Sequence, residues 1–289
     1  MAYPDIPHPN PSPEWEGLKV SAALALAAER LAALSDTPRL DAEMLMAHAL
    51  DIERETLLLS ALDSETPAAF EALLVRRLAG EPVAYIVGRR AFWTIELAVA
   101  PGVLIPRPDS ETLIEAALAH FGAGGPANIL DLGTGPGTLL LAALDQWPNA
   151  RGIGVDLSDA ALPLAAANAA RLGLAARARF RRGDWGEGLD ERFDLILCNP
   201  PYVEEGAALG PGVAEWEPHL ALFAGADGLD AYRRLAPAIG RLLCPRGIAC
   251  IEVGAGQADA VAPLFATQGF AVSSRSDLAG HVRCLILTP

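Results

Sequence analysis

The sequence predicts an α/β protein in which a doubly wound, mostly parallel sheet follows a small N-terminal helical bundle and a β-hairpin linker. Three observations lead to this prediction. Helical and strand-like patterns alternate from about residue 109 to the C-terminus, as expected of βαβ units. Residues 18–82 have helical patterns only, and short β-like runs lie between these two parts of the chain.

The composition indicates a globular protein and disfavours several functional classes. Of the 289 residues 52% are hydrophobic, which excludes disorder as the main state. A formal net charge of −14 disfavours nonspecific binding to a nucleic-acid backbone, and no apolar run is long enough to span a membrane. The four cysteines form no C-x-x-C pair and the five histidines are scattered, so we expect neither a disulfide framework nor a metal site.

Residues 1–17 are predicted to be a proline-rich leader. Five prolines lie among the first thirteen residues, and the basic start and apolar core of a signal peptide are missing. We therefore expect a loose leader on a cytoplasmic protein, and we expect this protein to be a monomer.

Residues 18–82 are predicted to form a small helical bundle. Strong helix formers fill residues 20–31. Asp36-Thr37-Pro38 places a capping residue before a proline at the first helical position, which starts a second helix that runs through Leu50. The same start signal precedes a third helix over residues 68–79, which a glycine ends.

Residues 83–108 are predicted to form the β-hairpin linker. Two short runs, 91–97 and 103–105, have the apolar and β-branched residues of strands. Pro101-Gly102 lies between the runs and indicates the turn of the hairpin.

The domain over residues 109–289 is predicted from the alternation of its patterns. Its first helix runs from about Asp109 to His120. The later elements, in chain order, are strand 128–132, helix 138–146, strand 151–155, helix 159–172, strands 177–182 and 193–198, helix 230–243, strand 247–253, helix 258–267 and a final pair of strands.

Four of these predicted strands end in polar or glycine-rich residues. In an open parallel sheet, ligands bind beyond the carboxyl ends of the strands, so we expect the four ends to form one site. In chain order they are Asp131-Leu132-Gly133-Thr134-Gly135-Pro136-Gly137-Thr138, Asp156, Asp184-Trp185 and Asn199-Pro200-Pro201-Tyr202.

The glycine-rich turn after the first of these strands is predicted to bind a cofactor. The turn Gly133-Thr134-Gly135-Pro136-Gly137 has G-x-G-x-G spacing, and Thr138 stands where the dinucleotide fingerprint needs its third glycine. The N–H groups at the start of the following helix favour a carboxylate as readily as a phosphate. The amino-acid end of a cofactor therefore fits this turn.

Three carboxylates and an aromatic ring complete the predicted cofactor site. Asp156 lies 23 residues after Gly133, where an acidic side chain can accept hydrogen bonds from both ribose hydroxyls of NAD or of S-adenosylmethionine. Asp184 offers an acceptor for an adenine edge, and Trp185 offers an aromatic face. Together with Asp131 these carboxylates form a negative rim that suits a sulfonium cation.

Plain structural roles compete with these assignments. Residues 133–137 would also suit an unliganded tight turn, and Asp156, together with Ser158 and Asp159, would also cap the helix that follows. Trp185 would also serve as an ordinary core or surface aromatic, and Asn199-Pro200-Pro201-Tyr202 as a turn that ends a strand.

The fourth strand runs directly into Asn199-Pro200-Pro201-Tyr202. Because proline has no N–H and a fixed φ, the two prolines leave nearby carbonyl oxygens without a ladder partner and free to bind a ligand. The stretch resembles the (D/N/S)-P-P-(Y/F/W) motif of class I S-adenosylmethionine-dependent methyltransferases that modify planar amino nitrogens. Adenine N(6) methylases and glutamine amide methylases both carry this motif.

Three other segments resemble those of one family within this class, the bacterial peptide chain release factor glutamine methyltransferases (PrmC, also called HemK). The similarity extends from about Leu18 to the C-terminal strands. Two conservative departures are Trp216-Glu217-Pro218, where Phe-Glu-Pro is usual, and Pro136-Gly137-Thr138, where a Thr-Gly or Ser-Gly sequence is commoner. The segments that carry the resemblance are residues 39–50, 80–93 and 104–111.

The resemblance implies a Rossmann-like class I methyltransferase fold with S-adenosylmethionine as cofactor. It implies that residues 133–137, Asp156, Trp185 and Asn199 bind this cofactor, and that Asn199-Pro200-Pro201-Tyr202 hold the substrate. The substrate of this family is the glutamine of the Gly-Gly-Gln loop in class I release factors. The helical domain over 18–82 is then expected to dock the protein substrate.

The chemistry of an amide indicates what the catalytic residues must do. An amide nitrogen is a poor nucleophile because its lone pair is delocalised into the carbonyl group. We expect the side-chain oxygen of Asn199 and the carbonyl of Pro200 to accept its two N–H hydrogens, and Tyr202 to pack on the amide plane. Arg107 would neutralise the cofactor carboxylate, shape the pocket or remain a solvated surface arginine. Glu217 is a second candidate substrate-binding residue, and the sequence does not decide its role either.

Three other functions compete with this prediction. An adenine N(6) methyltransferase acting on DNA or RNA is disfavoured by the net charge and by the absence of a basic recognition segment. A dehydrogenase lacks the third fingerprint glycine, and a non-catalytic regulator that binds S-adenosylmethionine would not need Asn199 and Tyr202. We therefore predict transfer of a methyl group to release factors, with no nucleic-acid or membrane partner.

Overall fold

The computed structural model describes Trp15, residues 17–210 and residues 212–289, so most of the predicted leader lies outside the described residues. Trp15 is an exception to the expected loose leader, because it is only 4% exposed and meets the ring of Phe70 edge to face at 5.4 Å between centroids. The chain divides into two compact units, residues 1–88 with 209–216 and residues 89–208 with 217–289.

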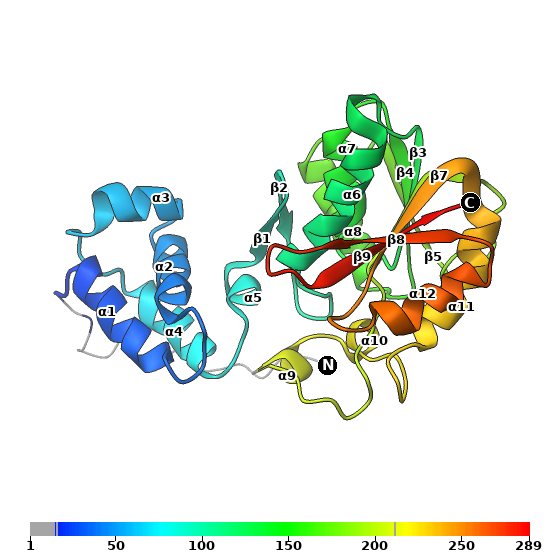
Figure 1. The fold of residues 1–289 in the computed structure, drawn as a ribbon. Helices are drawn as coiled ribbons and strands as arrows, with labels where there is room; N and C mark the ends of the chain where they lie inside the picture. The colour runs from blue at the N-terminus through cyan, green and yellow to red at the C-terminus, as the bar shows by residue number, and fades with distance from the viewer. Residues whose placement is uncertain (1–14, 16, 211) are drawn as a thin grey trace. The chain divides into compact units, whose positions relative to one another are not determined.

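The first unit is helical, and its three long helices confirm the predicted bundle (Figure 1). Their apolar faces meet in a core that includes Leu24, Leu45 and Phe70. The sequence did not indicate four shorter helical segments in this unit. The helices are α1 (Val20–Leu31), α2 (Pro38–Ala49), α3 (Arg54–Thr56), the π-helix η1 (Leu57–Ala61), α4 (Ala69–Leu78), α5 (Val83–Val87) and α9 (Val213–Trp216).

The second unit contains a seven-stranded sheet in the order β5-β4-β3-β6-β7-β9-β8. The first five strands of this order are parallel, and the last two pair in antiparallel fashion, so the predicted mostly parallel sheet is confirmed. The strands are β3 (Asn128–Leu132), β4 (Arg151–Asp156), β5 (Ala178–Arg182), β6 (Phe193–Cys198), β7 (Leu243–Glu252), β8 (Ala271–Ser276) and β9 (Val282–Thr288).

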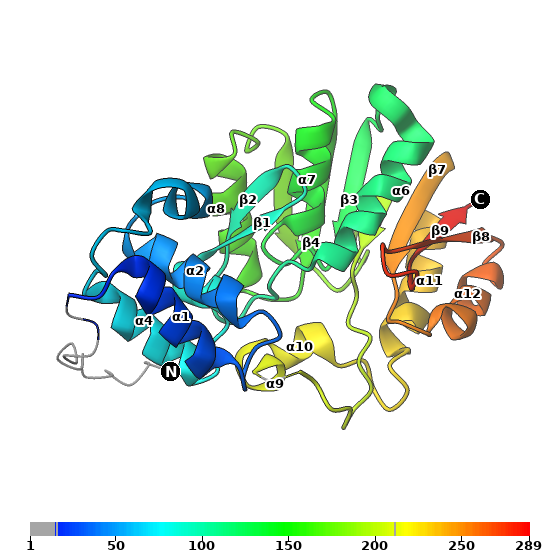
Figure 2. The same ribbon diagram turned by 60° about the vertical axis from the view of Figure 1, so that its left-hand side comes forward.

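Helices cover both faces of this sheet, as a doubly wound fold requires (Figure 2). Side chains alternate along β6, so Leu195 and Leu197 enter the core beneath α6, α7 and α8, whereas Ile196 and Cys198 enter the core beneath α11 and α12. The helical segments of this unit are η2 (Pro108–Ser110), α6 (Glu111–Phe121), η3 (Gly122–Gly124), α7 (Thr138–Gln146), α8 (Ala161–Arg171), α10 (His219–Leu222), α11 (Asp230–Leu242) and α12 (Ala258–Ala266).

The linker contains a β-hairpin, but the predicted position of its turn is wrong. Strands β1 (Arg89–Phe92) and β2 (Ile95–Ala98) pair in antiparallel fashion, and the chain reverses at Trp93, whose φ is 53°. The sequence predicts one strand over residues 91–97 and its partner over 103–105. The turn forms at Trp93 because its backbone N–H donates to Glu111 (2.9 Å) and its indole to Gln146 (3.2 Å), while residues 103–105 remain a loop.

A buried asparagine joins the hairpin to the glycine-rich turn. The side-chain oxygen of Asn168 on α8 accepts from the backbone N–H of Ala98 (2.8 Å). Its amide nitrogen donates to the carbonyl oxygens of Ala98 (3.0 Å) and Pro136 (2.9 Å). Because Asn168 is fully buried, water cannot replace these bonds, and the side chain fixes the turn against the rest of the unit.

Replacing Asn168 by alanine is expected to lower the free energy of unfolding by about 2–4 kcal/mol, because each buried polar group that loses its partner costs about 1–3 kcal/mol. Urea unfolding followed by circular dichroism measures this loss. The exposed Asn149→Ala change is the matched control, with an expected effect within about 0.5 kcal/mol. Equal unfolding free energies for the two variants would contradict the structural role of Asn168.

Candidate functional site

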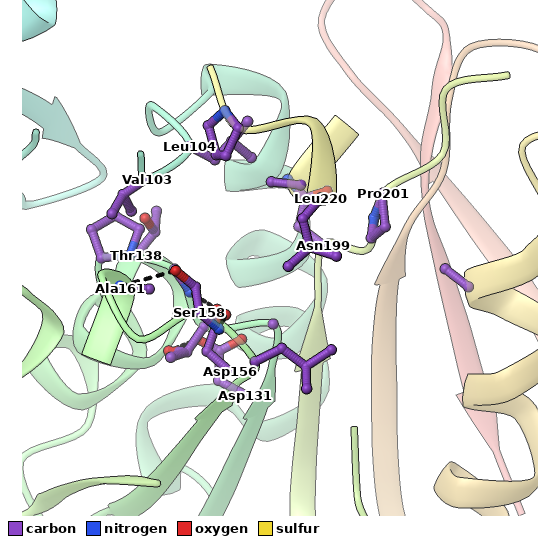
Figure 3. Close-up of a pocket in the computed structure, with 18 of the residues that line it drawn as sticks. Val103, Leu104, Asp131, Thr138, Asp156, Ser158, Ala161, Asn199, Pro201 and Leu220 are labelled. Atoms are coloured by element: carbon purple, nitrogen blue, oxygen red, sulfur yellow. Dashed lines mark hydrogen bonds between the residues drawn. The ribbon is translucent and has the colours of Figure 1, made fainter. Parts of the chain in front are cut away.

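The carboxyl ends of β3, β4 and β6 meet at one cavity of about 380 Å³ in the second unit. Strand β3 has β4 on one side and β6 on the other, so the cavity lies where the strand order reverses, as in other doubly wound sheets. Figure 3 shows Asp131 and Asp156 along one side of this cavity and Asn199, Pro201 and Leu220 along another.

The structure brings ten of the predicted site residues into the lining of this cavity, and the other five lie outside the lining. The lining includes Arg107, Asp131, Gly133, Thr134, Gly135, Pro136, Asp156, Trp185, Asn199 and Pro201. The residues outside the lining are Gly137, which precedes α7, together with Asp184, Pro200, Tyr202 and Glu217.

The glycine-rich turn is held against β4 by backbone hydrogen bonds. The N–H groups of Gly133 and Thr134 both donate to the carbonyl of Val155, at 2.9 and 3.0 Å. The φ angles of Gly133, Gly135 and Gly137 are 75°, 54° and 89°, in the left-handed region that glycine tolerates best. The turn therefore presents its backbone to the cavity at the start of α7.

Asp156 stabilises the same turn from the end of β4. Its carboxylate accepts from the N–H groups of Gly135 and Ser158, each at 2.8 Å. Of the three residues in the competing capping role, Ser158 accepts from the backbone N–H of Ala161, the first residue of α8, whereas Asp156 accepts from no N–H group of that helix. A carboxylate has about four acceptor positions, so two of those on Asp156 remain for a ligand.

Asp131 is a buried carboxyl group at the base of the cavity, with 1% of its surface exposed. One oxygen accepts from the hydroxyl of Thr134 (2.6 Å) and the backbone N–H of Leu140 (3.2 Å). The other oxygen is buried and has no partner among the residues that the structure describes. Burial raises the pKa of Asp131 from 3.8 to about 7; its two hydrogen bonds lower the pKa, and the charge of Asp156 raises it.

Asp184 and Trp185 follow β5, and of the two only Trp185 lines the cavity. One oxygen of Asp184 pairs with Arg234 on α11, while the other is buried and lacks a partner among the described residues. Trp185 has a φ of 50° and packs its ring on the core beneath α11, with part of the ring bordering the cavity. Sequence reasoning missed Arg234, because nothing in its local pattern distinguishes it from other surface arginines on a helix.

Asn199 is fixed by a series of hydrogen bonds that begins at Ser110, which also lines the cavity. Its amide nitrogen donates to the hydroxyl of Ser110 (3.0 Å), which donates to the carboxylate of Glu252 (2.5 Å). The hydroxyl of Tyr202 donates to the other oxygen of that carboxylate (3.3 Å). The side-chain oxygen of Asn199 and the carbonyl of Pro200 accept no hydrogen bond from any described residue.

Glu217 is buried and supports the wall of the cavity. Its carboxylate accepts from the backbone N–H of Ile105 (3.1 Å) and pairs with the guanidinium of Arg107. Both partners belong to the loop that lines the cavity, so Glu217 holds this loop in place. Arg107 keeps about one-third of its side chain exposed.

Two further features bear on the type of site. Within the described ranges, no group of three or more histidine, cysteine, aspartate or glutamate residues is arranged to hold a metal ion. No helix in the same ranges combines the length and the apolar character needed to cross a membrane.

Comparison with protein families gives two matches. Residues 22–88 match the PrmC N-terminal domain, and residues 126–255 match a methyltransferase domain. A release factor glutamine methyltransferase of Cereibacter sphaeroides is 47% identical over 274 residues, covering 92% of this chain and 97% of that protein. A release factor glutamine methyltransferase of Rhodospirillum rubrum is 45% identical over 258 residues, covering 87% of this chain and 79% of that protein.

Two solved structures with a similar fold are methyltransferases. A 16S rRNA N2 G1207 methyltransferase of T. thermophilus, in complex with AdoMet and guanosine, matches with a TM-score of 0.51 and 21% identity over 70% of this chain and 50% of that one. A methyltransferase of Pyrococcus furiosus matches with a TM-score of 0.52 and 18% sequence identity, covering 74% of this chain and 95% of that one. These likenesses confirm the Rossmann-like class I methyltransferase fold that the motifs predicted.

Replacing Asp131 by asparagine is expected to stabilise the ligand-free protein at pH 8 by about 1–4 kcal/mol, since one pKa unit corresponds to about 1.4 kcal/mol. The raised pKa means that the folded state holds the Asp131 proton more tightly than the unfolded state does, so stability falls as the pH rises from about 4 to about 7. Urea unfolding at several pH values measures the effect. The gain should shrink as the pH is lowered from 8 toward 4, and a pH-independent gain would contradict the account.

Proposed function

This chain belongs to the release factor glutamine methyltransferase family, and we propose that it methylates the side-chain amide nitrogen of the glutamine in the Gly-Gly-Gln loop of class I release factors. The methyl group comes from S-adenosylmethionine, which leaves as S-adenosylhomocysteine. The observation that carries the proposal is the pair of unpaired acceptors, the Asn199 side-chain oxygen and the Pro200 carbonyl, at the end of β6.

The residues around the cavity fit S-adenosylmethionine. The buried oxygen of Asp131 that lacks a partner, with Asp156 nearby, favours a cationic ligand, and S-adenosylmethionine carries a sulfonium and an ammonium group. Asp156 would accept the ribose hydroxyls, and the turn over residues 133–137 would bind the amino-acid end at the start of α7. Asp184 and Trp185 would bind the adenine.

Asn199 and Pro200 are proposed to bind the substrate amide and to make it nucleophilic. The resonance that weakens an amide nitrogen is the one that gives a peptide bond a rotation barrier of about 18–20 kcal/mol. Two acceptors on its N–H hydrogens orient the nitrogen and stabilise the positive charge that grows on it. One such contact contributes about 3 kcal/mol, by analogy with the loss of one oxyanion-hole donor.

Alignment of the reacting atoms is proposed to lower the reaction barrier more than the two hydrogen-bond acceptors do. Alignment of nitrogen, methyl carbon and sulfur can lower a barrier by about 7–11 kcal/mol. Tyr202 would pack on the amide plane, and its hydroxyl is already tied to Glu252. No strong general base is needed, because the proton leaves to water once the nitrogen has become positive. Arg107 and Glu217 would shape the wall through which the substrate loop enters.

The protein partner is proposed to be a class I release factor that docks on the helical region over residues 18–82. Support comes from the match of residues 22–88 to the PrmC N-terminal domain and from the compactness of that unit. We further propose that the protein acts as a cytoplasmic monomer and that no nucleic acid serves as acceptor. The net charge of −14 supports the last point.

Replacing Asp156 by asparagine is expected to weaken binding of S-adenosylmethionine and S-adenosylhomocysteine about equally, by roughly 10- to 100-fold. Hydrogen bonds to a charged group contribute about 1.5–3 kcal/mol, and both ligands have the same ribose. Isothermal titration calorimetry measures both affinities. Asp159→Asn, which changes an exposed carboxylate three residues away, is the control with unchanged binding. Unchanged binding in Asp156→Asn would refute the proposed ribose site.

Methyl transfer from labelled S-adenosylmethionine tests the reaction itself. We expect label on a purified class I release factor, none on the same factor with its loop glutamine replaced by alanine, and none on duplex DNA. Asn199→Ala should lower kcat by about 100- to 1,000-fold, the usual cost of removing one preorganised group that stabilises transition-state charge. Label on DNA would overturn the protein substrate, and label on the glutamine-free factor would overturn the proposed acceptor atom.

A further inference from the structure

Behind Asn199 lies a buried carboxylate to which the proposed mechanism assigns no chemical step. Glu252 ends β7, the strand that pairs with β6 just before Asn199, and it is 0% exposed. A buried carboxylate is costly to a fold unless its oxygens find hydrogen-bond donors. The donors here are the hydroxyls of Ser110 (2.5 Å) and Tyr202 (3.3 Å).

The chemistry of this hydrogen-bond chain determines which end of the Asn199 amide faces the cavity. An ionised carboxylate can only accept, so the Ser110 hydroxyl must donate its single proton to Glu252. The Ser110 oxygen can then only accept from Asn199, which must turn its NH₂ group toward Ser110 at 3.0 Å. The side-chain oxygen of Asn199 is therefore left for the cavity, which Asn199 lines in Figure 3.

We propose that Ser110 and Glu252 are positioning residues that lock the Asn199 amide in the orientation able to accept the N–H of a substrate amide. This inference rests on the proposed function and deepens it, because it explains how the enzyme selects an NH₂ group rather than a carbonyl oxygen at Asn199. A flipped Asn199 would present its own NH₂ to the substrate NH₂, and two donors repel.

The same carboxylate also holds Tyr202, the side chain proposed to pack on the substrate amide. The hydroxyl of Tyr202 donates to the oxygen of Glu252 that Ser110 does not use. Tyr232 on α11 donates to the backbone carbonyl of Glu252 (3.0 Å), and Gln257 donates to the carbonyl of Tyr202 (2.9 Å). Glu252 thus links Asn199, through Ser110, to Tyr202 and fixes the two side chains relative to each other.

The donor-to-acceptor direction of the hydrogen bonds that join Asn199, Ser110 and Glu252 depends on the charge of Glu252. A protonated Glu252 can donate to Ser110, which frees the Ser110 hydroxyl to donate to Asn199 and favours the flipped amide. Burial raises the pKa of Glu252 from 4.5 to about 7. The fraction of enzyme with an ionised Glu252, the form expected to be active, should therefore increase as the pH rises through about 7. The titratable or charged groups that act on Glu252 are Asp109, Tyr202, Tyr232, Arg283, Cys198 and Cys284.

The test compares Ser110→Ala with Ser110→Thr in the full-length enzyme, with a class I release factor and saturating S-adenosylmethionine. Loss of the hydroxyl in Ser110→Ala should lower kcat by about 10- to 100-fold, by analogy with the loss of the hydrogen-bond partners that orient metal ligands, with less than a threefold change in KM for the release factor. Ser110→Thr, which keeps the hydroxyl, should recover most of the activity. Thr112→Val removes a hydroxyl from the same helix start, where it donates to Asp109, and should leave kcat unchanged.

A pH profile separates orientation of Asn199 from simple structural support. The cationic groups of saturating S-adenosylmethionine favour the ionised form of Asp131, so Asp131 is not expected to titrate in this assay. The wild-type kcat should therefore rise through about pH 7 with the ionisation of Glu252, and Glu252→Gln, which cannot ionise, should have a flat profile between pH 6 and 8.5. Equal kcat for Ser110→Ala and wild type, or an unchanged inflection in Glu252→Gln, would overturn the inference. If Ser110→Ala does not fold, the other two variants test the inference. It then stands only if Ser110→Thr keeps most of the wild-type kcat and the pH profile of Glu252→Gln is flat. Absence of label with the wild-type enzyme would instead refute the proposed function.

Discussion

The convergence of three parallel strand ends at the point where strand order reverses is the constraint on which the rest of the second unit depends. It brings a glycine-rich turn, an acidic side chain and the Asn-Pro-Pro-Tyr stretch to one cavity although they are far apart in the sequence. Because the two prolines end β6 without offering N–H groups, the acceptors beside them stay free for a substrate. Cofactor and substrate can therefore meet at adjacent strand ends.

The site concentrates negative charge where the fold alone would avoid it. Burial raises the pKa of both Asp131 and Glu252 to about 7, so each carboxylate costs stability when it ionises. In the proposed mechanism the two costs serve different ends, since Asp131 attracts a cationic cofactor and Glu252 orients Asn199. Hydroxyl groups of Thr134 and Ser110 offset part of each cost. Such a trade between stability and function is typical of active sites.

The sequence predicted those features that leave a local pattern. Alternating helices and strands indicated the sheet, and the lining positions of Asp156 and Asn199 could be predicted because Asp156 ends one buried strand and Asn199 follows another. The turn at Trp93 was missed because a tryptophan with positive φ gives no turn signal, whereas Pro101-Gly102 does. Polar contacts between distant residues were also missed. Ser110 and Glu252 are 142 positions apart, and no periodicity or spacing links a buried hydroxyl to a buried carboxylate at that separation.

A crystal structure of the enzyme with S-adenosylhomocysteine and a class I release factor would test the central claim most directly. The account predicts that the side-chain nitrogen of the loop glutamine lies within about 3.2 Å of both the Asn199 side-chain oxygen and the Pro200 carbonyl, the range of a normal hydrogen bond. Its own carbonyl oxygen should point away from Asn199. A glutamine whose carbonyl oxygen faces Asn199, or whose nitrogen contacts neither acceptor, would contradict the account.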